Sequence, residues 1–116
     1  MKFEKVLLAS DFDGTLKTDD GIITDDVKSA IKYFMDNGGY FTVCTGRIFQ
    51  GFHLYSPEYI NAPVLMGNGA MAYDYNTDKV LFNDAIGDEG LDSIFDILKT
   101  FPEMCIEFYN FNKVCA

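Results

Sequence analysis

The sequence predicts an α/β fold whose core is a doubly wound, mainly parallel sheet. Apolar runs of strand length alternate with helical stripes, and turn residues separate them. The 116 residues contain 48% hydrophobic residues, which suits a packed core and at most one full-sized domain. With 9 basic and 18 acidic residues the net charge is −9, which argues against a binder of nucleic acid or anionic membranes.

The first strand, helix and second strand are predicted from their periodicity. Residues 6–10 form a continuous apolar run, typical of a strand buried on both faces of a parallel sheet. A helix is predicted from an N-cap at Thr24 to a glycine stop at residues 38–39. Its apolar stripe consists of Val27, Ala30, Ile31, Phe34 and Met35. Residues 40–44 are the next strand, and the helix between the two favours a right-handed, parallel crossover.

The signals that follow are shorter. A helix is predicted after Arg47, with Pro57 at its end, and a strand over residues 64–66. The apolar positions of this helix are Ile48, Phe49, Phe52 and Tyr55. Residues 70–75 and 79–82 are predicted to form a hairpin around a polar turn at 76–78.

The last part of the chain predicts a helix that begins at Asp88 and stops before Pro102, then a strand over residues 104–109. Between the hairpin and this helix, the composition changes near residues 84–87. This change predicts a boundary between a doubly wound core and a segment appended to it.

Two polar motifs follow the first two strands, where parallel sheets bind their ligands. Asp11 and Asp13 are one residue apart, so one carboxylate can act as nucleophile or metal ligand while the other acts as acid and base. The Thr45-Gly46-Arg47 motif offers a hydroxyl, an exposed backbone N–H and a guanidinium, which suit a tetrahedral oxyanion. Each motif alone is also ordinary turn chemistry: a solvated loop, and a strand-to-helix turn with a threonine N-cap.

An apolar strand ending in DFDGTL, a second ending in TVCTGR and a later MGNGA segment resemble the haloacid dehalogenase-like (HAD) superfamily. The likeness is greatest to its Cof-type (subclass IIB) sugar-phosphate phosphatases. It implies a Rossmann-like core of three α/β/α layers with a parallel sheet, and an α+β cap. The family's later lysine and its Gly-Asp-Gly-x-Asn-Asp cluster are absent. The resemblance therefore implies a fragment: residues 1–84 as the N-terminal part of an incomplete core, and residues 85–116 as the start of a truncated cap.

The same resemblance implies a phosphatase that hydrolyses a small phosphorylated metabolite, such as a sugar phosphate, through an aspartyl-phosphate. Asp11 would be the nucleophile, and Asp13 the general acid and base. Mg²⁺ would be held by the carboxylate of Asp11 and the backbone carbonyl of Asp13. The residues implied to contact phosphate or substrate are Thr45, Gly46, Arg47 and Asn68, although Gly-Asn-Gly is also good turn chemistry.

Other readings remain open at this stage. A phosphomutase uses the same chemistry, and a non-catalytic remnant would bind metal or phosphate without turnover. A signalling receiver domain, by contrast, is rejected, because it requires an acceptor aspartate after the third strand, where Met66-Gly67-Asn68 stands instead. His53, the single histidine, is expected at a partly exposed helix position. The acidic residues Asp19, Asp20, Asp25 and Asp26 are expected in a solvated loop and a helix start.

The expected location is the cytoplasm. No apolar stretch reaches the length of a membrane span, and the N-terminus has too short an apolar run for a signal peptide. Three cysteines without metal-site spacing suit reduced thiols. An incomplete parallel sheet leaves an exposed edge, so self-association or pairing with the missing C-terminal part is also expected.

Overall fold

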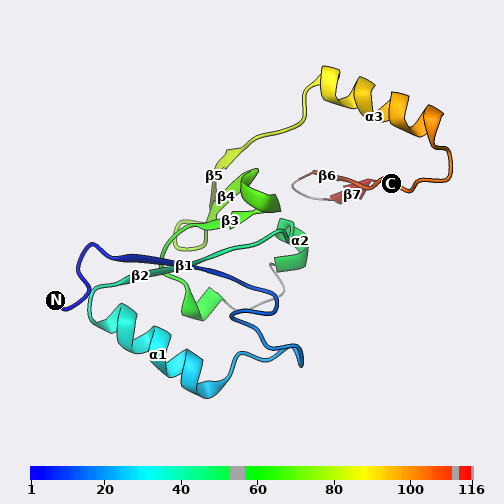
Figure 1. Ribbon diagram of the computed structural model, residues 1–116. Coiled ribbons are helices and arrows are strands. Elements are labelled where there is room, and N and C mark those ends of the chain that lie inside the picture. Colours follow the sequence, from blue (N-terminus) through cyan, green and yellow to red (C-terminus); the bar gives the residue numbers. More distant parts are fainter. Residues whose placement is uncertain (53–56, 111–112, 116) are drawn as a thin grey trace.

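The computed structural model describes residues 1–52, 57–110 and 113–115. Its main sheet has five strands in the order β1-β2-β3-β4-β5 (Figure 1). Their bounds are Leu7–Asp11, Tyr40–Cys44, Val64–Met66, Met71–Asp74 and Lys79–Asn83. Strands β1 to β3 are parallel, whereas β4 and β5 each run antiparallel to the preceding strand. The parallel crossover and the hairpin are therefore both confirmed, and the sheet is mixed.

The remaining elements are short apart from two helices. In chain order they are α1 (Asp25–Asp36), α2 (Phe49–Phe52), η1 (Pro57–Tyr59), η2 (Gly67–Gly69), α3 (Asp88–Thr100), β6 (Phe108–Asn110) and β7 (Lys113–Cys115). Figure 1 shows α3 and the β6–β7 pair standing beyond the sheet, joined to it by the segment after β5. Within the described residues, the helices are all too short or too polar to cross a membrane.

Helix α1 begins and ends as its sequence predicts. The Thr24 hydroxyl accepts a hydrogen bond from the backbone N–H of Val27, as an N-cap does. At the other end the N–H of Gly39 donates to Phe34 O at 3.0 Å. A Cβ on Gly39 would lie 2.4 Å from the ring of Phe34, so any other residue would force that ring to move. The stripe faces the core, with Ile31 buried, although Ala30 is exposed.

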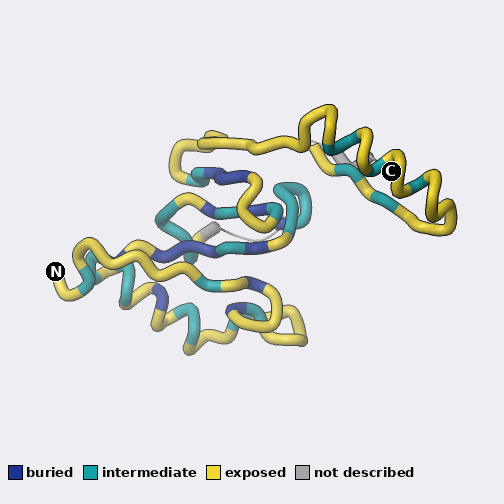
Figure 2. The backbone as a smooth tube through the Cα atoms, turned by 45° about the horizontal axis from the view of Figure 1, so that its top comes forward, coloured by how far each residue is buried: buried dark blue, intermediate teal, exposed yellow. Residues whose placement is uncertain are grey.

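Strand β1 corrects one prediction. It was expected to be buried on both faces, yet Leu7 is 61% exposed and Leu8 is 50% exposed. The reason is its place in the sheet: β1 is an edge strand among the described residues, and α1 packs mainly against β2, so little covers the two faces of β1. The buried residues gather instead on β2, β3 and β4, as the dark blue segments of Figure 2 show.

The helix predicted after Arg47 is present as α2 over Phe49–Phe52, whereas its predicted positions His53 and Tyr55 lie outside the described residues. One later segment differs from its prediction. The strand predicted over 104–109 begins only at Phe108, and β7 was not foreseen. The backbone N–H of Met104 donates to Phe101 O at 3.1 Å, so the chain is still turning there, and β6 begins only where Phe108 pairs with Cys115 of β7.

Candidate active site

The register of the parallel strands brings the two sequence motifs together. Asp11 is the last residue of β1 and lies opposite Cys44, the last residue of β2. Thr45 follows directly, and its backbone N–H donates to Leu65 O on β3 at 2.9 Å. Asn68 lies just after the end of β3. The candidate residues therefore share the carboxyl edge of the parallel strands, where open α/β sheets bind ligands.

The loop after β1 is a tight turn that separates apolar from polar side chains. Gly14 has a φ of +72°, which glycine adopts without strain. The side chains of Phe12 and Leu16 are buried, and Asp11 and Asp13 are exposed. The Thr15 hydroxyl donates to Oδ2 of Asp11 at 3.1 Å. The loop is thus anchored by its apolar residues, and Thr15 orients the carboxylate assigned as nucleophile.

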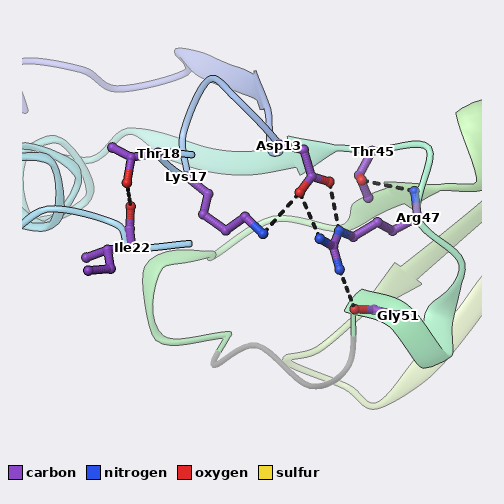
Figure 3. A network of polar contacts seen from close by, with 7 residues as sticks. All are labelled: Asp13, Lys17, Thr18, Ile22, Thr45, Arg47 and Gly51. Carbon is purple, nitrogen blue, oxygen red and sulfur yellow. Dashed lines mark hydrogen bonds and ion pairs between the residues drawn. The ribbon is translucent and has the colours of Figure 1, made fainter. Parts of the chain in front are cut away.

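Asp13 lies between two cations (Figure 3). Arg47 donates from Nε to Oδ2 at 2.7 Å and from Nη2 to Oδ1 at 2.8 Å, a bidentate pair. The Lys17 ammonium lies 3.1 Å from Oδ1. Arg47 also donates from Nη1 to Gly51 O at 3.2 Å, and this bond ties the guanidinium group to α2. Both cations lie over the ring of Phe12, at 5.5 and 5.6 Å from its centroid.

This arrangement lowers the pKa of Asp13 well below its ordinary value. The main cause is the hydrogen bond from Arg47; a smaller contribution comes from Lys17, and partial desolvation opposes both. Asp13 is therefore ionised and paired at neutral pH in this state of the site. Its side chain remains 49% exposed, so water and substrate can reach it.

Replacing Arg47 by Met is expected to raise the pKa of Asp13 toward the ordinary aspartate value. The change removes the largest stabilisation of the carboxylate, and Lys17 alone remains. The carboxyl carbon of Asp13, followed by NMR against pH in the metal-free chain, reports the shift. Lys32→Met is the matched control, because Lys32 pairs with Asp36 on the surface of α1. An unchanged titration of Asp13 would show that the pair with Arg47 is absent in solution.

The second motif is joined to the loop after β3. Thr45 is buried, and its Oγ1 accepts a hydrogen bond from the Arg47 backbone N–H at 3.0 Å. The backbone N–H of Asn68 donates to Thr45 O at 3.2 Å. A Cβ on Gly46 would lie 2.9 Å from Oδ1 of Asn68, so the Asn68 side chain lies close to the Gly46 backbone and would have to move for a larger residue. Asn68 adopts a φ of +56°, a conformation that asparagine tolerates better than most residues.

The structure thus joins most of the predicted residues in one network, because Arg47 bonds Asp13 through its side chain and Thr45 through its backbone N–H. Asn68 contacts Thr45 and Gly46, while Asp11 is joined to this network through the β1–β2 register. Three participants were missed: Phe12, Thr15 and Lys17. The four-residue spacing from Asp13 to Lys17 was the only sequence signal for the lysine, and it is equally common on solvated surfaces.

The donor set fits Mg²⁺. Asp11 presents a hard carboxylate, the ligand type that Mg²⁺ prefers. Both carboxylate oxygens of Asp13 are held by Lys17 and Arg47, which leaves its backbone carbonyl as the donor that the sequence resemblance implies. Within residues 1–52, 57–110 and 113–115 there is no cluster of three or more His, Cys, Asp or Glu suited to a metal. The described residues therefore supply part of a coordination shell.

Comparison with known proteins finds relatives among hydrolases and phosphatases. The family model for haloacid dehalogenase-like hydrolases matches residues 8–116. The candidate phosphatase YxeH of Bacillus subtilis is 31% identical over 96 residues, covering 78% of this chain and 35% of that protein. YitU of the same species, named as a 5-amino-6-(5-phospho-D-ribitylamino)uracil phosphatase, is 27% identical over 117 residues, covering 100% and 41%. The chain thus spans well under half the length of these relatives.

Solved structures show the same fold. A HAD-superfamily phosphatase of Bacteroides thetaiotaomicron, BT1666, superposes with a TM-score of 0.80 at 22% identity, covering 97% of this chain and 41% of that one. The subclass IIB sugar phosphatase BT4131 superposes with a TM-score of 0.77 at 20% identity, covering 95% and 43%. At these identities the likeness shows the fold alone. Because the family match extends over nearly the whole sequence, the chain belongs to the haloacid dehalogenase-like hydrolases.

Proposed function

We propose that the complete protein containing this chain is a Mg²⁺-dependent phosphatase that acts through an aspartyl-phosphate. The observation that carries the proposal is the pair Asp11 and Asp13 at the end of β1, with Thr45 and Arg47 beside it. A phosphate monoester dianion repels a carboxylate nucleophile, so attack requires cations and fixed donors around the phosphate. Arg47, the Thr45 hydroxyl and the Gly46 backbone supply such donors, and Mg²⁺ would supply further neutralisation when bound.

Each aspartate has a separate role in this proposal. A carboxylate oxygen of Asp11 attacks phosphorus while the bond to the leaving alcohol breaks, and Asp13, after taking a proton from solvent, gives that proton to the alcohol. Asp13 then takes a proton from water, which attacks the phosphoaspartate; the bond from phosphorus to Asp11 breaks and phosphate leaves. For the first proton transfer the pKa of Asp13 must rise. A phosphate dianion that competes for Arg47 has this effect, because it removes the largest cause of the lowered pKa.

The chain spans only part of the length of its relatives, which affects both the activity and the substrate that can be proposed for it. We propose that residues 1–84 are the first part of the catalytic core and that residues 85–116 begin a cap, with further core strands completing the phosphate and metal sites. The exposed edge of β1 is the place where such a strand, or a second copy of the chain, would pair. A small phosphorylated metabolite, such as a sugar phosphate, is the proposed substrate, supported by the likeness to phosphatases of this family. A cytoplasmic location is part of the same proposal.

Removing Mg²⁺ is expected to abolish phosphate release by the complete protein. With EDTA, hydrolysis of p-nitrophenyl phosphate should fall to the background rate, and added Mg²⁺ should restore it, whereas Ca²⁺ should not because it prefers longer bonds and more ligands. The 116-residue chain alone should show little or no turnover in the same assay. Full activity in EDTA would refute the metal requirement, and rapid turnover by the short chain would show that the additional strands are not required.

A further inference from the structure

Lys17 differs from the other lysines whose ion pairs are described. Its side chain is only 13% exposed, whereas those of Lys28, Lys32 and Lys99 are 38%, 72% and 80% exposed. A lysine side chain this little exposed is rare unless its charge is paired. The paired anion is Asp13, at 3.1 Å. The placement of Lys17 is therefore tied to the candidate active site and is unlike that of a solvated surface lysine.

The backbone of the loop fixes where the ammonium lies. The backbone N–H of Lys17 donates to Phe12 O at 2.9 Å, and Asp13 and Lys17 form an isolated bridge. The ammonium lies over the ring of Phe12, which is itself 2% exposed and packed edge-on against Phe52. The buried Leu16 anchors the preceding position. Lys17 and Asp13 thus belong to one turn, whose backbone bonds and buried Phe12 ring place the two side chains next to each other.

Arg47 reaches the same carboxylate from another segment. It comes from the connection after β2, and Figure 3 shows it approaching Asp13 from the side opposite Lys17. Arg47 uses both oxygens of Asp13, while the Lys17 ammonium lies 3.1 Å from Oδ1. If Arg47 turns toward the phosphate of a substrate, its contacts with Asp13 weaken. Lys17 is the cation that stays, because it is part of the same turn as Asp13.

We propose that Lys17 is a positioning residue that holds the carboxyl group of Asp13 in its working orientation while Arg47 engages the substrate phosphate. This inference rests on the proposed phosphatase function. An acid and base must be aligned with the leaving oxygen and later with water, and a small misplacement slows both proton transfers. Lys17 acts through Asp13 and does not itself bind phosphate.

Kinetics of the complete protein test this role. Replacing Lys17 by Met should lower kcat about tenfold, since misaligned catalytic groups cost rate. KM and inhibition by inorganic phosphate should stay within about twofold, because Lys17 makes no contact with phosphate in this role. Lys17→Arg should restore most of kcat. Lys28→Met is the matched control, since Lys28 is also partly buried, lies over the ring of Tyr59 and is outside the site; it should leave kcat unchanged.

A double variant separates positioning from other effects. In the Asp13→Asn background, Lys17→Met should lower kcat little further, because the group that Lys17 orients no longer transfers protons. An unchanged kcat in the single variant would overturn the proposal. A rise in KM together with weaker phosphate inhibition would also overturn it and would make Lys17 a phosphate ligand. Full additivity with Asp13→Asn would show that Lys17 acts independently of Asp13.

The orientation of the Asp13 side chain can be measured by NMR without any enzymatic turnover, so the role of Lys17 can be tested separately from the proposed phosphatase function. In the 116-residue chain carrying Arg47→Met, the χ1 coupling constants of Asp13 should still indicate one rotamer, held by Lys17. In the Lys17→Met, Arg47→Met double variant they should average over several rotamers. If the couplings already average with Arg47→Met alone, Lys17 does not hold Asp13 and the inference fails. If the wild-type complete protein hydrolyses no phosphate ester, the proposed function fails, and these couplings still decide whether Lys17 orients Asp13.

Discussion

Replacing Asp11 by Asn is expected to abolish phosphate release from p-nitrophenyl phosphate by the complete protein. An amide oxygen is a far poorer nucleophile than a carboxylate, and the loss should be about 10⁴-fold or more, as for other enzymes that lose their nucleophile. The fold should be unaffected, because the amide carbonyl can still accept the hydrogen bond from the Thr15 hydroxyl. Phosphate release and hydroxylamine trapping of the phosphoenzyme are the two measurements.

The matched control for Asp11 is Asp19→Asn. Asp19 lies in the same region of the chain but is exposed and belongs to the polar turn before α1. This variant removes one negative charge without altering the proposed nucleophile, so it should keep normal turnover. Retained turnover in Asp11→Asn, or a phosphoenzyme that still forms there, would contradict the assignment of Asp11.

Replacing Asp13 by Asn is the second change with a large expected effect. Without the acid, kcat should fall about 10²- to 10⁴-fold, the usual contribution of general acid–base catalysis. The loss should be greater for an alkyl phosphate than for p-nitrophenyl phosphate, because the nitrophenolate leaves without a proton. The same variant lacks the base for the second step. The phosphoenzyme should therefore accumulate with p-nitrophenyl phosphate, and hydroxylamine trapping or mass spectrometry would detect it.

Asp20→Asn serves as the control for Asp13. Asp20 is an exposed neighbour of Asp19 in the turn before α1, and its substitution should leave both leaving-group dependence and phosphoenzyme level unchanged. If Asp13→Asn slowed alkyl and aryl phosphates equally, without accumulation of phosphoenzyme, then Asp13 would not be the acid and base. Such a result would favour a role for Asp13 in holding Arg47 alone.

The elements predicted most accurately are those whose signals are local. Helix α1 carries its own N-cap and apolar stripe, and the strand at residues 40–44 agrees with β2 to the residue. The strand at 64–66 and the hairpin after it were likewise correct to within a residue. Their hydrogen bonds form within the element or with a neighbour close in sequence. Periodicity and turn chemistry are therefore sufficient to predict them.

The errors arose where the outcome depends on distant parts of the chain. The apolar run of β1 predicts a buried strand, but its exposure depends on which other elements of the fold pack beside it and over its two faces. The segment at 104–109 has strand-like side chains, yet the turn between Phe101 and Met104 delays its extension. Neither the exposure of β1 nor the late start of β6 can be predicted from the residues of the segment itself.

The candidate site shows the same division. The sequence by itself determined which side chains stand at strand ends: Asp11, Asp13 and the Thr45-Gly46-Arg47 motif, because strand length and turn residues are local properties. Only the tertiary structure decided that Arg47 pairs with Asp13 and that Lys17 holds the same carboxylate. Those contacts depend on the β1–β2 register and on the path of the turn over Phe12. They join residues by geometry, and residue spacing does not carry that information.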